Sequence, residues 1–135
     1  MLILRLHSHY VDLLKQEAEK VHPVEACAML FGNLSRNEVV VEKVKFAPNE
    51  LQSTVRFEID PTNVTAAFTE AEEEGLDFIG LFHSHPAPAS PSPIDLKYMK
   101  LWGDALWLIL SSTEGNLAAY QLSDGTIKEA TIRVE

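Results

Sequence analysis

The sequence predicts an α/β fold in which a central mixed β-sheet is flanked by helices. Short apolar runs typical of strands alternate along the chain with two main helical segments, and Gly, Asn and Asp turns separate several of them. The chain has 135 residues and 46% apolar content, which suits a single domain over residues 1–135 with one well-buried core.

Charge and composition exclude several classes of protein. With 11 basic and 20 acidic residues the net charge is −9, so nucleic acid is not an expected partner. No apolar run reaches the roughly 20 residues that span a bilayer, and the N-terminus lacks the features of a leader peptide. A lone Cys27 suits a reducing compartment. We therefore expect a cytoplasmic protein without membrane partners, and leave its oligomeric state open, with a homodimer as one option.

The N-terminal half predicts three strands and one helix. Residues 2–6, 24–31 and 38–46 have the apolar or β-branched character of strands. Ser8 is expected to cap a helix that runs to Val21, with an apolar stripe facing the core.

The next segment predicts a short strand followed by the second main helix. Val55, Phe57 and Ile59 alternate as one inward strand face. Asp60-Pro61 then starts a helix that continues to about Glu74 and is closed by Gly75.

The remaining elements are a buried strand, a helix and three further strands. Residues 76–82 are almost continuously apolar, as in a strand buried on both faces. A proline-rich loop follows, and a helix is expected from Pro93, with Ser92 as its N-cap. Residues 106–110, 117–122 and 126–134 predict strands joined by hairpin turns.

Glu25 is a carboxylate in a predicted strand whose two faces are otherwise apolar. Burying it without a partner would be costly. Either Glu25 lies at a solvated strand end or a functional site holds it, and the residues alone leave both interpretations open.

The candidate metal site begins where the buried strand ends. His83 and His85 point to the same face of an extended segment, with Cα atoms about 6.6 Å apart, and Asp95 falls in the first turn of the next helix. Such a His pair can be surface decoration, and Asp95 can simply close a capping box with Ser92. Capping requires neither histidine, however. Together the three residues supply the ligand count that leaves tetrahedral zinc an open fourth position.

A second His-Ser-His tripeptide serves as an internal control. His7-Ser8-His9 is followed by no proline-rich loop, and Asp12 lies only three positions further on. We do not expect metal binding there.

HSHP followed by SPID resembles the JAMM motif of the MPN+ metallopeptidases. The segment PVEACAMLFG at residues 23–32 is similar to the glutamate-bearing strand of that family, and Asn49 with FEIDP at residues 57–61 is similar to its middle segment. The resemblance covers about residues 21–120 and implies the JAMM/MPN fold, which is cytidine-deaminase-like. It identifies His83, His85 and Asp95 as zinc ligands and Glu25 as the catalytic glutamate.

The serine of the motif is assigned with one ambiguity. The family places its aspartate eleven positions after the second histidine, whereas Asp95 is ten after His85. Counting back from Asp95 gives Ser92, which we favour because a deletion is absorbed more easily in the irregular loop than in a helix cap. Ser90 is the competing hydroxyl.

The resemblance implies a zinc-dependent isopeptidase or peptidase that cleaves after the C-terminal glycine of a ubiquitin-like modifier. A metal-activated water would attack, Glu25 would carry its proton, and Ser92 would stabilise the oxyanion. The expected partners are a ubiquitin-like or sulfur-carrier protein and its conjugates. The alternatives are a hydrolase that releases an amino acid such as cysteine from a sulfur carrier, and a non-catalytic MPN scaffold.

Overall fold

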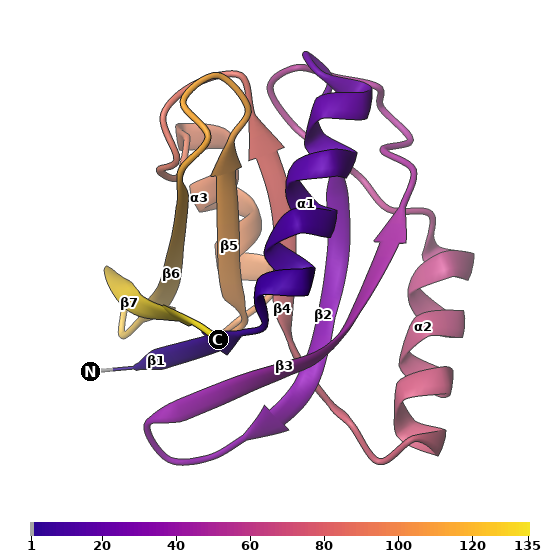
Figure 1. Cartoon of the computed structure of the whole chain (residues 1–135), viewed down its shortest axis with the longest axis vertical. Coiled ribbons are helices and arrows are strands. Elements are labelled where there is room, and N and C mark those ends of the chain that lie inside the picture. Colours follow the sequence, from indigo (N-terminus) through magenta and orange to yellow (C-terminus); the bar gives the residue numbers. More distant parts are fainter. Residues whose placement is uncertain (1) are drawn as a thin grey trace.

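The computed structural model describes residues 2–135, which form seven strands and three helices (Figure 1). In chain order the elements are β1 (Ile3–Leu6), α1 (Ser8–Val21), β2 (Cys27–Leu34), β3 (Glu38–Ala47), α2 (Pro61–Glu73), β4 (Asp77–His85), α3 (Pro93–Leu101), β5 (Leu106–Ser111), β6 (Leu117–Ser123) and β7 (Thr126–Val134).

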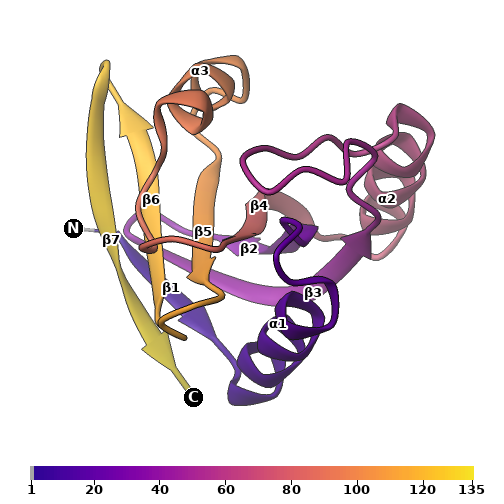
Figure 2. The same ribbon diagram turned by 90° about the horizontal axis from the view of Figure 1, so that it is seen from above.

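The strands form one mixed sheet in the order β1-β3-β2-β4-β5-β6-β7. β2 is antiparallel to β3 and β4, whereas β4 and β5 are parallel. β1 pairs in parallel with both β3 and β7, so the sheet curls until its first and last strands meet (Figure 2). The predicted mixed sheet flanked by helices is confirmed, and the pairing of its end strands is a feature that the sequence did not predict.

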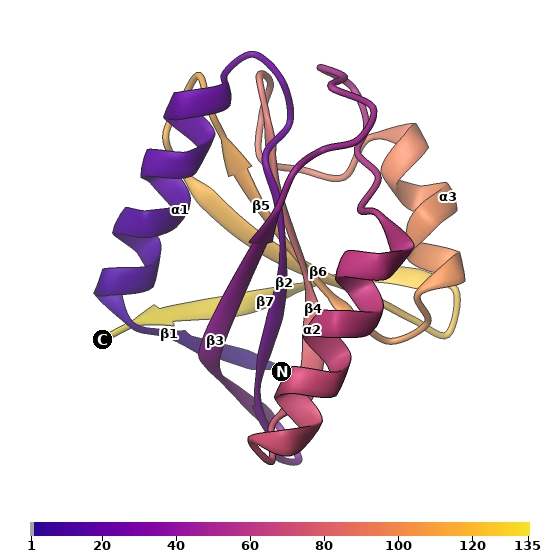
Figure 3. The ribbon, with the colours of Figure 1, turned by 90° about the vertical axis from the view of Figure 1, so that its right-hand side faces the viewer.

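Helices cover both faces of the central strands (Figure 3). α1 lies on one side of β2 and β4 and contributes Leu14 and Ala18 to a core cluster with Leu30 and Phe82. α2 and α3 lie on the other side, where a second cluster is built from these residues: Met29, Phe31, Ala67, Ala71, Leu81, Met99 and Trp107. Because successive residues of β2 and β4 point to opposite clusters, the apolar runs of both strands are explained.

The parallel contact between β4 and β5 depends on Gly80. A Cβ atom on this residue would lie 1.9 Å from the carbonyl oxygen of Leu106, well inside van der Waals contact. Glycine therefore lets the two backbones approach, and this close pairing positions β4, the strand that ends in the two histidines.

Several predicted element ends are confirmed. Asp60 caps α2 by accepting a hydrogen bond from the Thr62 N–H at 2.8 Å, and Gly75 follows the helix with φ of 73°. Ser92 caps α3 and Pro93 is its first residue. None of the three helices between residues 2 and 135 is long and apolar enough to cross a membrane.

Three local predictions were wrong. α1 is capped by His7 instead of Ser8, because the His7 Nδ1 atom accepts a hydrogen bond from the His9 N–H at 2.9 Å. β2 begins at Cys27, so Glu25 precedes the strand in which it was expected. Residues 55–59 form no strand. The Asn49 side chain hydrogen bonds to the Arg56 carbonyl and to the Glu58 N–H in place of a partner strand, and Val55 is 56% exposed.

Candidate metal centre

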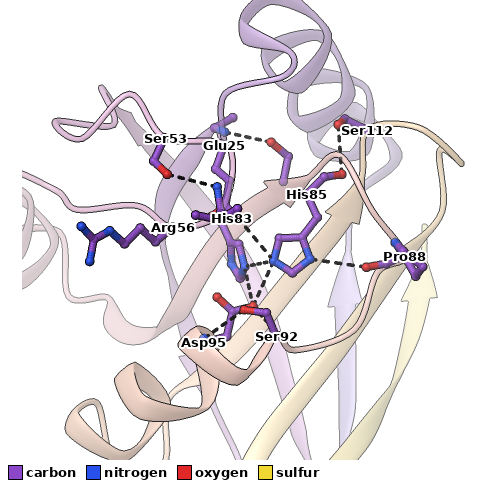
Figure 4. Close-up of polar contacts among 12 residues, drawn as sticks. Glu25, Ser53, Arg56, His83, His85, Pro88, Ser92, Asp95 and Ser112 are labelled. Carbon is purple, nitrogen blue, oxygen red and sulfur yellow. Dashed lines mark hydrogen bonds and ion pairs between the residues drawn. The ribbon is translucent and has the colours of Figure 1, made fainter.

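Two carboxylate and two imidazole side chains meet where β4 ends (Figure 4). Glu25, His83, His85 and Asp95 are all buried, and each offers a ligand atom within 4.8 Å of the others. The structure thus brings together the four side chains that the sequence predicted, from three separate segments.

β4 holds the two histidines rigidly, because it is paired on both sides at this point. His83 is aligned with Cys27 of β2 and with Ile109 of β5. The His85 carbonyl accepts hydrogen bonds from both the N–H and the hydroxyl of Ser112, at 2.6 and 3.0 Å. The two Nε2 atoms consequently face one another at 2.9 Å.

Asp95 completes a triangle of ligand atoms. Its Oδ2 lies 3.1 Å from His83 Nε2 and 3.0 Å from His85 Nε2. Tetrahedral coordination with zinc–nitrogen bonds of about 2.0–2.1 Å places neighbouring ligand atoms about 3.3 Å apart. The triangle is therefore close to the size that a zinc ion requires, and its donors are the imidazole and carboxylate groups that zinc accepts.

The protonation states of His83 and Asp95 suit a cation at this triangle. Burial lowers the pKa of the His83 imidazole, which favours the neutral form that binds metals. Burial alone would raise the pKa of the Asp95 carboxyl, but hydrogen bonds to His83 and His85 hold it well below its ordinary value. His85 Nδ1 lies 3.4 Å from the Pro88 carbonyl, so a proton on Nδ1 leaves the Nε2 lone pair directed at the triangle.

Glu25 lies beside the triangle without belonging to it. Its Oε2 is 3.6 Å from His85 Nε2, while Oε1 is buried and has no hydrogen-bond partner among the described residues. Burial raises the pKa of this carboxyl to about 8, with Asp95 adding to the increase and His85 opposing it. Of the two interpretations that the sequence left open, the solvated strand end is wrong, because Glu25 is 1% exposed.

The two candidate serines differ in their surroundings. Ser92 is half-buried and its Oγ accepts a hydrogen bond from the Asp95 N–H at 3.1 Å. Ser90 is exposed, and its N–H donates to the Pro88 carbonyl at 2.8 Å. Ser92 is thus the serine in direct contact with a candidate ligand.

The control tripeptide lies outside this group of side chains. Among residues 2–135, the group of Glu25, His83, His85 and Asp95 is the one set of at least three potential ligands with this spacing. His7 and His9 are exposed, and His7 serves as a helix cap.

Sequence reasoning missed the aromatic wall of the site. The Phe57 ring stacks on the His83 ring with centroids 4.9 Å apart, and the Trp107 ring meets His83 edge-on at 5.6 Å. Both aromatic residues looked like ordinary core, because apolar periodicity does not reveal which neighbour a ring contacts. Asn49 was noted only as part of a family-like segment, although its side chain hydrogen bonds to the Glu25 carbonyl at 3.1 Å.

Comparison with known proteins identifies close relatives of this chain. A domain family described as prokaryotic homologs of the JAB domain matches residues 7–123. The desampylase of Pyrococcus furiosus is 45% identical over 114 residues, which cover 83% of this chain and 77% of that protein. A probable TtuB-protein conjugate cleaving protease of Thermus thermophilus is 34% identical over 90 residues, or 63% of this chain and 56% of that protein.

A solved structure shows the same fold. The solution structure of protein DSY2949 from Desulfitobacterium hafniense superposes with a TM-score of 0.89 at 27% sequence identity, covering 98% of this chain and 92% of that one. The shared fold thus covers nearly the whole chain.

Proposed function

Because this chain belongs to the JAMM/MPN+ family, as one of the prokaryotic homologs of the JAB domain, we propose that it is a zinc-dependent isopeptidase or peptidase. It would cleave after the C-terminal glycine of a ubiquitin-like modifier. The observation that carries this proposal is the triangle of His83, His85 and Asp95 ligand atoms with a free carboxylate oxygen of Glu25 beside it. The desampylase and the TtuB-protein conjugate cleaving protease support this substrate class by their similarity.

His83 Nε2, His85 Nε2 and Asp95 Oδ2 would hold the zinc ion. When bound, zinc supplies a Lewis acid that polarises the scissile carbonyl and lowers the pKa of a water molecule. These three residues lie on β4 and in the first turn of α3, so regular secondary structure holds the backbone of each one.

Glu25 would act as the general base and then as the general acid. Its Oε1 has no partner among the described residues, so it is free to accept a proton from the attacking water. The same carboxyl can return that proton to the leaving amine, which must be protonated to depart. Burial keeps competing solvent away from this oxygen.

The Ser92 hydroxyl would donate a hydrogen bond to the scissile carbonyl oxygen as negative charge develops there. The Ser92 oxygen already accepts the Asp95 N–H, and the hydroxyl hydrogen remains available for a second hydrogen bond. Such a donor acts where charge appears in the transition state.

The C-terminal tail of the modifier would enter beside the Phe57 face of His83. A cavity of about 250 Å³ opens there, lined mainly by Phe57, Ile59, Tyr98, Trp102 and Trp107. The buried Trp107 Nε1–H has no hydrogen-bond partner among the described residues. An extended tail could place an apolar side chain in this cavity.

The state of the single cysteine fits a cytoplasmic enzyme. Cys27 is unpaired, and a free buried thiol is compatible with the reducing cytoplasm in which we propose that the enzyme acts.

The test is cleavage by the purified, zinc-loaded protein. We would incubate it with isopeptide-linked ubiquitin-like conjugates, with linear fusions, and with a sulfur carrier ending in cysteine. Mass spectrometry should show a new C-terminal glycine on the modifier, and Glu25→Gln should show none. Cleavage of the cysteine-terminated carrier alone would favour the amino-acid-releasing hydrolase. No cleavage of any substrate would favour the scaffold and contradict the proposed function.

A further inference from the structure

The Asn49 side chain organises the loop between β3 and α2. Its Nδ2 donates to the carbonyls of Glu25 and Arg56 at 3.1 and 3.0 Å. Its Oδ1 accepts from the N–H groups of Leu51 and Glu58 at 3.1 and 3.2 Å. Asn49 itself is 9% exposed. One buried amide therefore replaces the backbone pairing that a strand would have supplied in this segment.

The backbone of Glu25 lies outside the β2 ladder, which begins at Cys27. On the loop side, the Glu25 N–H donates to the Ser53 carbonyl at 2.9 Å, and the Glu25 carbonyl accepts from Asn49 (Figure 4 shows Ser53 beside Glu25). On the β4 side, the next residue is held by Ser84, whose Oγ accepts the Ala26 N–H at 2.8 Å and whose N–H donates to the Ala26 carbonyl at 3.0 Å. Backbone pairing with β4 thus ends at Ala26, and the backbone of Glu25 itself is held by the loop and by the Asn49 side chain.

The Glu25 carboxylate has little else to fix it. Oε1 has no hydrogen-bond partner among the described residues, and Oε2 lies 3.6 Å from His85 Nε2, beyond hydrogen-bond distance. Its location relative to the metal triangle is therefore set mainly by the backbone that carries it.

We propose that Asn49 is a positioning residue for Glu25 in the reaction. Asn49 is not a catalytic residue, since it contacts the Glu25 backbone and not the carboxylate. It holds the base at the working distance from the triangle by joining the Glu25 carbonyl to the loop that also carries Phe57. Asparagine suits this position because one end of its amide donates and the other accepts. This inference rests on the proposed function.

The experiment compares Asn49→Asp and Asn49→Ser with Asn63→Asp, a matched control on the exposed surface of α2. Aspartate cannot donate to the Glu25 carbonyl, and serine is too short to reach all four partners. For both Asn49 variants we expect kcat to fall about 10- to 100-fold, because small misplacements of reacting groups slow a reaction by such factors. KM should change by less than about threefold, because the base does not bind the ground-state substrate. Asn63→Asp should have the same kcat and KM as the unmodified protein.

Two readouts separate positioning from general damage. Zinc content should stay at one ion per chain, because the ligands lie on β4 and α3. Combining each Asn49 substitution with Glu25→Gln should produce little loss beyond that of Glu25→Gln alone, since a base that is absent cannot be misplaced. Hydrogen exchange at the Glu58 amide should accelerate in Asn49→Ser and stay slow in Asn63→Asp, which reports on the loop without any activity measurement.

The outcomes distinguish this inference from the proposed function. If Glu25→Gln is inactive while both Asn49 variants keep normal kcat, the positioning role is refuted and the proposed function stands. Losses that multiply in the double variants also refute it, because Asn49 would then act independently of Glu25. If Glu25→Gln keeps full activity, the proposed base is wrong and the positioning role falls with it. Should Asn49→Asp fail to fold, Asn49→Ser, which introduces no buried charge, decides the question.

Discussion

Ser92 and Asp95 hold each other through two reciprocal hydrogen bonds. The Ser92 Oγ accepts the Asp95 N–H at 3.1 Å, and the Ser92 N–H donates to Asp95 Oδ2 at 3.0 Å. This Oδ2 is also the atom that faces His83 and His85. Helix capping and metal ligation, which the sequence presented as alternative interpretations of Asp95, are therefore compatible: the cap orients the ligand.

The role of Ser92 is tested by comparison with Ser90. Ser92→Ala should lower the free energy of unfolding by about 1 kcal/mol, the usual contribution of an N-cap hydroxyl. It should also lower kcat by at least about tenfold through the loss of a transition-state donor. Ser90→Ala, at an exposed position, should change neither quantity. Urea denaturation and steady-state kinetics measure both effects, with zinc content checked in each variant. A strong kcat loss in Ser90→Ala together with a normal Ser92→Ala would reverse the assignment.

Zinc loading tests the ligand set. The unmodified protein should bind about one zinc ion per chain. His83→Ala, His85→Ala and Asp95→Ala should each abolish stoichiometric loading, because only two ligands would remain. His7→Ala is the control, since His7 is an exposed helix cap. Elemental analysis of the purified variants gives the result directly, and normal zinc in His85→Ala would exclude the proposed centre.

Glu25→Gln separates proton transfer from coordination. The substitution keeps the size of the side chain, and Glu25 lies 3.6 Å from His85 outside the ligand triangle. We expect normal zinc content and a loss of at least about 100-fold in turnover, the lower range for general acid–base catalysis. Loss of zinc in this variant would instead make Glu25 a ligand.

Cys27 should be unreactive in the folded protein. Burial raises the pKa of its thiol from 9.0 to about 12, with Glu25 and other carboxylates adding to the increase. A disulfide reagent at pH 8 should therefore label Cys27 rapidly only after denaturation.

The same shift makes the thiol destabilising at high pH. Between about pH 9 and 12 the unfolded thiol ionises while the folded one does not. The contribution of the neutral thiol to stability is complete below pH 9 and is lost as the pH rises towards 12. Between pH 8 and pH 10.5, the free energy of unfolding measured with urea should thus decrease more for the unmodified protein than for Cys27→Ala. Equal decreases would contradict the shift.

The cavity beside His83 is tested with Trp107→Phe, which removes the unpartnered indole N–H and keeps an aromatic ring. The smaller ring changes the shape of the cavity that would hold an apolar side chain of the tail, which should reduce kcat/KM by roughly 10-fold or more. Zinc content must be measured as well, because the Trp107 ring contacts His83. Unchanged kcat/KM with normal zinc would place the tail elsewhere.

The conformation of residues 55–59 depends on side-chain contacts that no sequence pattern contains. The predicted strand over Val55, Phe57 and Ile59 was wrong because Asn49, a buried side chain, takes hydrogen bonds that a strand partner would otherwise make. The alternation of apolar residues was real, since Phe57 and Ile59 pack against the second core cluster. Periodicity thus predicted the packing of Phe57 and Ile59 correctly, but it was wrong for Val55, which is 56% exposed, and for the backbone pairing.

The local geometry of the candidate site follows from short segments of the sequence. Two-residue periodicity puts His83 and His85 on one face of β4, and Ser92 with Pro93 fixes where α3 begins and hence where Asp95 lies. These features depend on neighbours within a few residues, so local rules were sufficient. In contrast, Glu25 is 58 positions before His83 and lies beside the triangle because of long-range strand pairing. Antiparallel pairing of β2 with β4 aligns Cys27 with His83 and brings the preceding residues to the same end of the sheet. That register results from the packing of the whole core, because each strand must bury both faces at once, and no short segment carries this information.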